Sequence, residues 1–361
     1  MKAHFPFVVS LLFLRALAVP ARADEIDDYV KATISQRNIP GLSLAVVRDG
    51  RLVKAAGYGF ANLELAAPAT PETVYEIGSI TKQFTAEAIM LLVQEGKLGL
   101  DDPLGKHLDG LPIKWQPLTL RQLLTHTSGL KDWESANLLS FRRDYTPDEF
   151  IKLLSAYPLD FTPGERWSYT NTAYPLLGLV IARVSGQSYE DFVAERIFRP
   201  LGLHGTRFLH SQEIVPQRAS GYVDEAGKLQ KGDPRRPDLL RPNGGILSSV
   251  RDLAKWERIF STEQVLKRAS LEQMQTPVRL NNGKTFNCGF GLFMDVFHGH
   301  RLIVHNGSTA GGFSSVFYHY PDDKLTVIVL CNIDRGDAVN LIATRVASFY
   351  VPGLAIGEKP Q

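Results

Sequence analysis

Gly78-Ser79-Ile80-Thr81-Lys82 leads into the apolar run Gln83-Phe84-Thr85-Ala86-Glu87-Ala88-Ile89-Met90-Leu91-Leu92-Val93, which ends near Gly96. A glycine turn followed by a run with so few charges predicts a mostly buried helix. Residues three positions apart lie on one helical face, so Ser79 and Lys82 are expected to point the same way from its first turn. The rest of the chain decides what this pair does.

Ser79 and Lys82 have the residue types of an activated nucleophile. A serine hydroxyl is a weak nucleophile until a neighbouring group takes its proton. A lysine amine in a poorly solvated pocket can take that proton, because burial disfavours the charged ammonium. The N-terminus of the helix adds unpaired backbone N–H groups nearby. Ser-x-x-Lys also occurs by chance, and the alternative interpretation is a capping serine followed by a surface lysine.

Length and charge limit the possible classes of protein. The chain has 361 residues, more than the roughly 250–300 at which one hydrophobic core usually stops growing. One large domain with an inserted lobe, or two domains, is therefore expected. The formal net charge is +2 and no dense basic cluster is present, so nucleic acid is not an expected partner.

The N-terminus has the pattern of a secretory signal peptide over residues 1–23. Lys2 precedes an apolar run from Phe5 to Val19, and Ala21-Arg22-Ala23 precedes Asp24. The run is too short for an ordinary transmembrane helix, and the alternative is an uncleaved N-terminal anchor. We expect a mature chain that starts near Asp24, lies in the periplasm or is secreted, and has no stable membrane span.

Strand patterns lie at both ends of the chain and helical patterns lie between them. Asp49-Gly50 is a two-residue hairpin turn between two β-rich runs near the N-terminus. The simplest arrangement is one sheet built from both chain ends, covered by the terminal helices and carrying a helical lobe. This divides the chain into a sheet subdomain, 24–70 plus 285–361, and a helical subdomain, 71–284. Strands are expected at 42–48, 51–58, 290–295, 301–305, 313–320 and 325–331. Helices are expected at 24–37, 146–156, 172–184, 250–260 and 338–350. A further helix is expected from the Ser79 turn to Gly96, and another opens with the capping box 119–122 and closes at 127–129.

Three short motifs then occur in a fixed order. Ser79-x-x-Lys82 opens the buried helix, Tyr169-Thr170-Asn171 lies in a loop ahead of another helix, and His305-Asn306-Gly307 ends an expected strand and is followed by Ser308. In this order they resemble the serine β-lactamase and penicillin-binding protein superfamily. The closest likeness is to the class C branch, which also holds D-Ala-D-Ala carboxypeptidases, D-aminopeptidases and carboxylesterases. Supporting stretches are Leu123-Leu-Thr-His-Thr-Ser-Gly129, Phe161-Thr-Pro-Gly164, Tyr174-Pro-Leu-Leu-Gly178 and Gly244-Gly245-Ile-Leu-Ser248.

The resemblance implies an α+β fold of the α/β/α type, with an antiparallel five-stranded sheet flanked by helices and a mostly helical lobe inserted. It implies that Ser79 attacks a carbonyl and forms an acyl-enzyme. Lys82 and Tyr169 would share the proton transfers, and the sequence leaves open which of them is the general base. Asn171 would hydrogen-bond the substrate and help to fix Lys82.

The strand motif is implied to form the opposite wall of the pocket. The backbone N–H groups of Ser79 and Ser308 would form the oxyanion hole, where negative charge develops in the transition state. His305 and Gly307 would line the substrate pocket. No metal or other cofactor is expected, and a monomer that acts on a small-molecule or peptide substrate is the simplest assembly.

His305 departs from the family pattern, because many β-lactamases have lysine at the first position of this motif. A lysine gives a fixed positive charge for a substrate carboxylate, whereas a histidine is mostly neutral at pH 7. The substitution disfavours a carboxylate-bearing β-lactam and suits the peptidase, amidase and esterase branches. Thr170 also replaces a smaller residue, with little expected effect.

The leading hypothesis is an exported serine hydrolase that cleaves an ester, amide or lactam, with esterase or D-Ala peptidase-like activity. The alternatives are a true β-lactamase, a penicillin-binding or scaffolding protein with little turnover, and a pure binding module. No Gly-x-Ser-x-Gly occurs, so the nucleophile elbow of the α/β-hydrolases is not available.

The remaining histidines and cysteines of interest are expected to be structural. His298-Gly-His300 has the residue types of a metal pair, but it lies at an expected hairpin tip with no third ligand nearby in sequence. His126 is expected to be structural at a helix end. Cys288 and Cys331 are expected to be free thiols, because the proposed strand order separates them.

Overall fold

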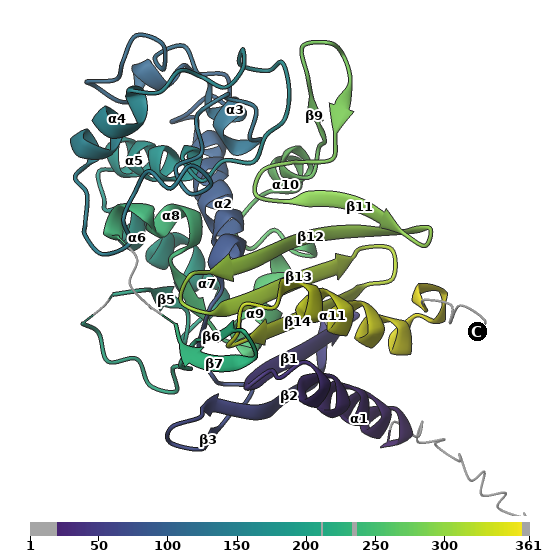
Figure 1. The fold of residues 1–361 in the computed structure, drawn as a ribbon. Coiled ribbons are helices and arrows are strands. Elements are labelled where there is room, and N and C mark those ends of the chain that lie inside the picture. Colours follow the sequence, from purple (N-terminus) through teal and green to yellow (C-terminus); the bar gives the residue numbers. More distant parts are fainter. Residues whose placement is uncertain (1–19, 211, 233–236, 356–361) are drawn as a thin grey trace, which may run out of the picture.

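The structure is a computed structural model that describes residues 20–210, 212–232 and 237–355. Its largest sheet has seven antiparallel strands in the order β11-β12-β13-β14-β1-β2-β3 (Figure 1). The central pair joins β1 from the N-terminal part to β14 from the C-terminal part, which confirms the prediction of one sheet built from both ends. The strands are β1 (Gly41–Arg48), β2 (Arg51–Asn62), β3 (Ala67–Pro68), β11 (Phe293–Phe297), β12 (His300–Thr309), β13 (Phe313–Tyr320) and β14 (Leu325–Cys331).

The sheet has seven strands, whereas the resemblance implied five and the sequence patterns indicated six. The differences lie at the two edges of the sheet. The two-residue β3 pairs with the end of β2 across a register irregularity between Phe60 and Asn62. At the other edge β11 pairs with β12 through a turn in which His298 and Gly299 have φ of 51° and 87°. The strand β12 also extends to Thr309, so the motif that starts at His305 lies inside this strand and not at its end.

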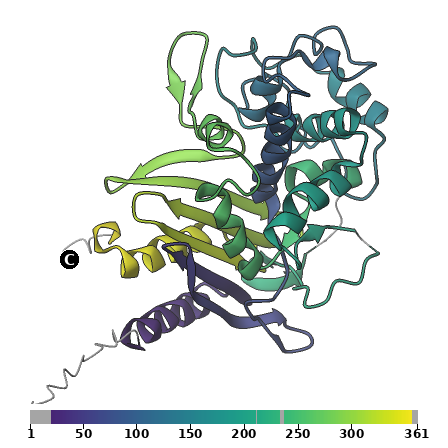
Figure 2. The same ribbon diagram turned by 180° about the vertical axis from the view of Figure 1, so that it is seen from behind.

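Helices cover both faces of the sheet. One face packs on α1 (Pro20–Gln36) and α11 (Gly336–Tyr350), which lie side by side across it in Figures 1 and 2. The other face packs on α9 (Val250–Trp256) and on the core of the helical lobe. Because both faces are covered, β1, β13 and β14 are buried along almost their whole length, and β1 and β14 are mostly apolar in sequence.

The predicted signal peptide lies mostly outside the described residues, and residues 20–23 form the first turn of α1. No helix in the described part of the chain is both long enough and apolar enough to cross a membrane. Cys288 and Cys331 are both buried and free, as expected.

The bounds of several lobe helices follow from capping side chains. Thr119 and Gln122 form a reciprocal capping box at α3 (Leu120–Leu124), and Thr146 and Glu149 form another at α4 (Pro147–Ser155). Gly186, with φ of 74°, ends α5 (Ala173–Ser185) in the left-handed conformation that glycine adopts without strain. The remaining helices are α2 (Thr81–Gln94), α6 (Tyr189–Val193), the π-turn η3 (Ala194–Phe198), α7 (Arg199–Leu201), α8 (Arg241–Gly244) and α10 (Arg268–Met274).

The smaller elements complete the lobe and its connections. Three short strands pair in the order β4-β8-β5 beside the start of α2, and two hairpins extend from the body. The short strands are β4 (Tyr75–Glu76), β5 (Arg207–Phe208), β6 (Tyr222–Glu225), β7 (Lys228–Lys231), β8 (Ile246–Ser248), β9 (Val278–Arg279) and β10 (Thr285–Phe286), and the 3-10 turns are η1 (Gly78–Ile80), η2 (Leu104–Lys106), η4 (Asp238–Leu240), η5 (Glu257–Phe260) and η6 (Pro352–Leu354).

Glu87 is a buried acid in the middle of α2. Its side chain is fully buried, and neither carboxyl oxygen has a hydrogen-bond partner among the described residues. Burial raises the pKa of Glu87 to about 8. Between the pKa of an unfolded glutamate, about 4.3, and this value, the folded chain holds a proton that the unfolded chain has lost. Stability therefore falls as the pH rises through this window.

Replacing Glu87 by glutamine is expected to remove the free-energy cost of protonating this carboxyl group on folding, because an amide stays neutral in both the folded and the unfolded state. We expect the Glu87→Gln variant to be more stable than the wild type by about 3 kcal/mol at pH 7, and its stability to depend less on pH from 5 to 8. Thermal unfolding across this range measures both effects, with the exposed Glu263→Gln as the matched control. A destabilised Glu87→Gln variant with an unchanged pH slope would contradict the assignment of a protonated acid.

Candidate active site

Ser79 lies in the 3-10 turn η1, which is pressed against β12 immediately before α2 begins. Gly78 has φ of 51°, and a Cβ at this position would lie 2.9 Å from both the N and the O of Ser308. Only glycine permits this approach, so Gly78 brings the first turn of the helix onto the strand. As a result the half-buried Ser79 and the strand motif, far apart in sequence, become neighbours.

Lys82 is completely buried directly behind Ser79. Its Nζ lies 3.0 Å from Ser79 Oγ, 2.9 Å from Asn171 Oδ1 and 2.8 Å from the carbonyl oxygen of Asn243. Both asparagine oxygens can only accept hydrogen bonds, whereas the serine hydroxyl can also donate one. When the amine is neutral, the asparagines therefore hold its two N–H groups and its lone pair faces the Ser79 proton. The amine is thus placed to receive that proton.

Tyr169 lines the same cavity as Ser79. Its ring centroid is 4.9 Å from Lys82 Nζ. Loss of solvation is the main cause that raises the pKa of Tyr169 well above its usual range, and the carboxylates of Glu134 and Asp132 act in the same sense. The Ser79 hydroxyl opposes this shift through a hydrogen bond. At neutral pH Tyr169 is consequently a protonated phenol beside the serine.

His126 supports Tyr169 from behind. The two rings are stacked with centroids 4.4 Å apart, and His126 Nδ1 accepts a hydrogen bond from the backbone N–H of Thr170. The His126 backbone is left-handed, with φ of 58°, and its carbonyl accepts from the N–H of Ser168. Burial lowers the pKa of His126 well below its usual value, so the ring is a neutral acceptor here. His126 therefore has a structural role, and this role is to position the loop that carries Tyr169.

Asn171 connects Lys82 to two carboxylates. Its Oδ1 accepts from Lys82, its Nδ2 donates to Glu134 Oε2 at 2.6 Å, and its backbone N–H donates to Asp132 Oδ1 at 2.6 Å. These contacts fix the orientation of the amide, because its two ends require different partners. Sequence reasoning missed Asp132, Glu134 and Asn243. The two acids lie in a loop without a recognisable motif, and Asn243 acts through a backbone carbonyl that any residue has.

The strand β12 forms the opposite wall with His305, Gly307 and Ser308. A Cβ on Gly307 would lie 2.1 Å from the carbonyl oxygen of Ile77, so only glycine fits where this strand passes the turn that carries Ser79. The Ser308 hydroxyl donates to Asp334 Oδ1 at 2.9 Å, away from the Ser79 hydroxyl. Ser308 can therefore reach a substrate through its backbone.

His305 is a neutral acceptor at the wall of the site. Its Nδ1 lies 2.7 Å from the carbonyl oxygen of Asn306, which can only accept, so Nδ1 carries the proton and Nε2 does not. Burial lowers the pKa of His305 to about 3, and the charge of Lys82 adds to this shift. Its Nε2 has no hydrogen-bond partner among the described residues. The side chain therefore supplies no positive charge at pH 7.

Five of the seven predicted site residues line one cavity of about 570 Å³: Ser79, Tyr169, His305, Gly307 and Ser308. The other two, Lys82 and Asn171, are buried behind the serine. Asp295 is the charged side chain on the cavity wall, so the wall itself is acidic. The arrangement combines a half-exposed hydroxyl, a buried amine within hydrogen-bond distance and a protonated phenol, which are the parts of a nucleophilic acyl-transfer site.

The other candidate residues lie elsewhere. His298 and His300 belong to the β11–β12 hairpin, where His300 Nδ1 pairs with Asp323 Oδ2 at 2.8 Å. In residues 20–210, 212–232 and 237–355, no group of three or more histidine, cysteine or acidic side chains is close enough to hold a metal ion.

With this geometry in place, the comparison with known proteins defines the class. The chain belongs to the Beta-lactamase family, whose match extends over residues 26–349. This is a family of serine hydrolases. The confirmed resemblance covers nearly all the described residues, including every predicted site residue.

Individual relatives are similar over most of the chain. Penicillin-binding protein 4* of Bacillus subtilis is 32% identical over 83% of this chain and 70% of its own length. A solved structure of an octameric penicillin-binding protein homologue from Pyrococcus abyssi is 32% identical, has a TM-score of 0.78, and covers 91% of this chain and 77% of that one. D-amino acid amidase from Ochrobactrum anthropi is 25% identical, with a TM-score of 0.75 and coverage of 91% and 96%. The chain spans 64% to 70% of the length of the curated relatives it matches.

Proposed function

We propose that this protein is a serine hydrolase that cleaves an amide or ester through an acyl-enzyme on Ser79. The observation that carries the proposal is the position of Lys82 Nζ, held by Asn171 and Asn243 and 3.0 Å from Ser79 Oγ. Because these two oxygens can only accept, they orient a neutral amine so that its lone pair faces the nucleophile.

The proposed reaction has two halves. In the first, Ser79 Oγ bonds to the substrate carbonyl carbon, its proton passes to Lys82, and the phenol of Tyr169 gives a proton to the leaving group as the carbonyl–leaving-group bond breaks. The phenolate left on Tyr169 regains its proton from Lys82. The second half uses the same proton transfers in reverse. Tyr169 gives its proton to Lys82 and then takes one from a water molecule, whose oxygen bonds to the acyl carbon. Lys82 returns a proton to Ser79 Oγ as the acyl–oxygen bond breaks, which releases the acid and free Ser79. The backbone N–H groups of Ser79 and Ser308 stabilise the oxyanion in both halves.

The charges around the site favour a substrate that carries an amine. Asp295 lies on the cavity wall, and Asp132 and Glu134 flank the Asn171 amide. His305 adds no positive charge to attract a carboxylate. Two solved relatives are named for activity on D-compounds, a D-amino acid amidase and a D-stereospecific amidohydrolase. We therefore propose amides or esters of D-amino acids with a free α-amine as the substrate class.

Glu134→Gln tests this substrate class, because glutamine keeps an oxygen that can accept from Asn171 and loses only the charge. We expect kcat/KM for a D-amino acid p-nitroanilide to fall about tenfold, because the variant loses one exposed charge contact with the substrate amine. We expect no change for the N-acetylated substrate, which has no such charge. Both rates are measured with the wild type and the variant, and the L-enantiomers test stereochemistry. An equal fall for both substrates would mean that Glu134 only positions Asn171 and does not recognise an amine.

A second candidate is a penicillin-binding protein with slow deacylation, which the similarity to Penicillin-binding protein 4* favours. The two candidates differ in the second half-reaction. A labelled penicillin adduct that persists for hours, without release of hydrolysed product, would favour the slow protein, whereas rapid turnover of nitrocefin would favour the β-lactamase alternative. Steady release of free amino acid supports the proposed hydrolase.

We also propose export to the periplasm or the medium, supported by the charged, apolar and small-residue order of residues 1–23. N-terminal sequencing of the protein from the cell envelope and medium tests it. A mature terminus near Asp24 is the expected result, and an intact Met1 would contradict cleavage.

A further inference from the structure

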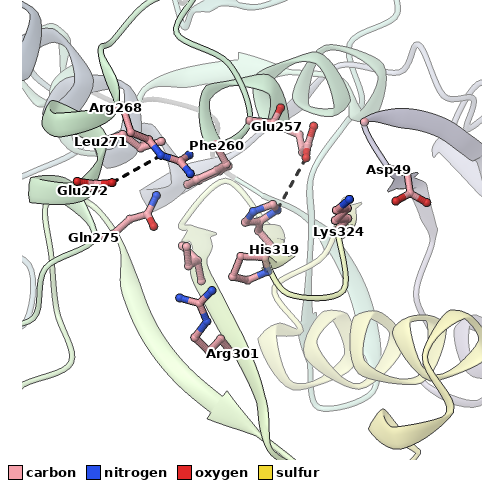
Figure 3. A pocket seen from close by; sticks show the side chains of 14 residues that line it. Asp49, Glu257, Phe260, Arg268, Leu271, Glu272, Gln275, Arg301, His319 and Lys324 are labelled. Atoms are coloured by element: carbon pink, nitrogen blue, oxygen red, sulfur yellow. Dashed lines mark ion pairs between the residues drawn. The ribbon is translucent and has the colours of Figure 1, made fainter.

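A second cavity, of about 680 Å³, lies between η5, α10 and the turn that joins β13 to β14 (Figure 3). It shares no lining residue with the cavity that holds Ser79. Ile303 on β12 forms part of its wall, and Ser308 lies five residues further along the same strand, about 17 Å away. The two cavities are therefore distinct but joined by one strand.

The deep part of this second cavity contains a buried carboxyl group and an imidazole. Glu257 and His319 point toward each other in Figure 3, with Glu257 Oε1 3.9 Å from His319 Nδ1. His319 Nδ1 is instead within 2.8 Å of Thr326 Oγ1. Glu257 is only 4% exposed, and its Oε2 has no hydrogen-bond partner among the described residues. A buried acceptor of this kind is costly to leave unpaired, so a donor from a ligand would be favoured here.

The walls beside Glu257 are apolar. Phe260, Leu271 and Ile303 are buried residues that line the cavity. The Phe260 ring stacks on His319, with centroids 4.5 Å apart and planes 17° apart. This surface suits the apolar side chain of a ligand, and it keeps the carboxyl group in surroundings of low polarity.

The rim of the cavity carries three cations, Arg268, Arg301 and Lys324, together with the acids Asp49 and Glu272. Arg268 lies 3.6 Å from Glu272, and Arg301 makes two hydrogen bonds to Asp322. Lys324 differs from these, because its ammonium makes no ion pair with any residue in the described part of the chain. Its backbone is fixed by the turn, with φ of 49° and its carbonyl accepting from the N–H of Asp49. Lys324 thus offers a positive charge from a fixed position on the rim.

From this arrangement we infer that the second cavity binds a free amino acid, with its ammonium at Glu257, its carboxylate at Lys324 and an apolar side chain against Phe260. The cavity volume is in the usual range for small-molecule sites. Burial raises the pKa of the Glu257 carboxyl, and an adjacent ammonium would lower it again. The inference does not depend on the hydrolase activity, because it uses none of the residues around Ser79.

Isothermal titration calorimetry of the full chain with four probes tests the charge requirement. The probes are D-phenylalanine, L-phenylalanine, 2-phenylethylamine without the carboxylate, and 3-phenylpropionate without the amine. At least one phenylalanine enantiomer is expected to bind, and each analogue with a single charge is expected to bind ~10- to 100-fold more weakly, because it loses one charge-assisted contact. Equal affinity for all four probes, or no binding of either amino acid, would overturn the inference.

Variants then locate the binding site. Glu257→Gln and Lys324→Met are each expected to weaken phenylalanine binding ~10- to 100-fold, whereas Glu134→Gln, beside Asn171 in the Ser79 site, is expected to leave binding at the second cavity unchanged. The opposite pattern would assign the bound amino acid to the Ser79 cavity and overturn the second site. Lys324 is exposed in a turn, so its variant tests the site even if the Glu257 variant does not fold.

Discussion

Ser79→Ala is expected to abolish covalent labelling by a fluorophosphonate and to lower kcat/KM by at least about 10⁴ on every substrate that the wild type turns over. Alanine removes the attacking oxygen, which is the hydroxyl that lies 3.0 Å from Lys82 Nζ. Intact-mass measurement before and after labelling gives the adduct directly. Turnover of p-nitrophenyl acetate gives the rate.

Ser308→Ala is the matched control, because Ser308 lines the same cavity and its hydroxyl points to Asp334. It keeps the backbone N–H proposed for the oxyanion hole, so the label is expected to remain. An adduct of undiminished yield on the Ser79→Ala protein would place the nucleophile elsewhere. Absence of both adduct and turnover in the wild type would favour a binding or scaffolding role.

The second large effect is expected at Lys82 and Tyr169, and it separates the two proton-transfer roles. Lys82→Met removes the group proposed to accept the Ser79 proton, so kcat/KM is expected to fall ~10²- to 10⁴-fold on amides and activated esters alike. Tyr169→Phe removes only the proposed donor to the leaving group. A p-nitrophenolate leaving group needs no proton, so this variant is expected to lose kcat/KM on amides but to retain most of its kcat/KM, which reports acylation, on p-nitrophenyl esters.

Reversal of these two patterns would make Tyr169 the base that activates Ser79. Lys82→Met also leaves the Asn171 and Asn243 oxygens without their buried donor, which costs roughly 1–3 kcal/mol for each. Thermal unfolding of the variant is therefore measured alongside its rates, and single-turnover acylation is measured below its unfolding temperature. A rate loss that persists where the variant is fully folded belongs to the chemistry.

Much of the fold was predictable because its signals are local. The Asp49-Gly50 hairpin, the capping boxes at Thr119 and Thr146, and the glycine that ends α5 each act within a few residues. The edges of the sheet were harder to predict. Two-residue β3 and the extension of β12 to Thr309 depend on which strand lies alongside, and the short segments themselves do not specify that pairing.

The same distinction applies to the site. Ser79-x-x-Lys82, Tyr169 and the strand motif were found because their chemistry is carried by side-chain type and spacing. Sequence reasoning did not find four other parts of the site. Asn243 acts through a backbone carbonyl, and Asp132 and Glu134 lie in an acidic loop without a motif. His126 acts through a ring stack. These contacts link residues up to 161 positions apart in the chain.

The sequence by itself therefore determined the α+β class and placed Ser79 and Lys82 on one turn and a histidine at position 305, since each follows from residue type, spacing or hydrophobic pattern. The tertiary structure alone decided the position of Lys82 Nζ between Ser79, Asn171 and Asn243, the acidic surroundings of Asn171, and the second cavity between η5, α10 and the β13–β14 turn. The physical reason is that a hydrogen-bond direction, an electrostatic environment and a cavity depend on the distances between side chains from separate elements. Only packing fixes those distances.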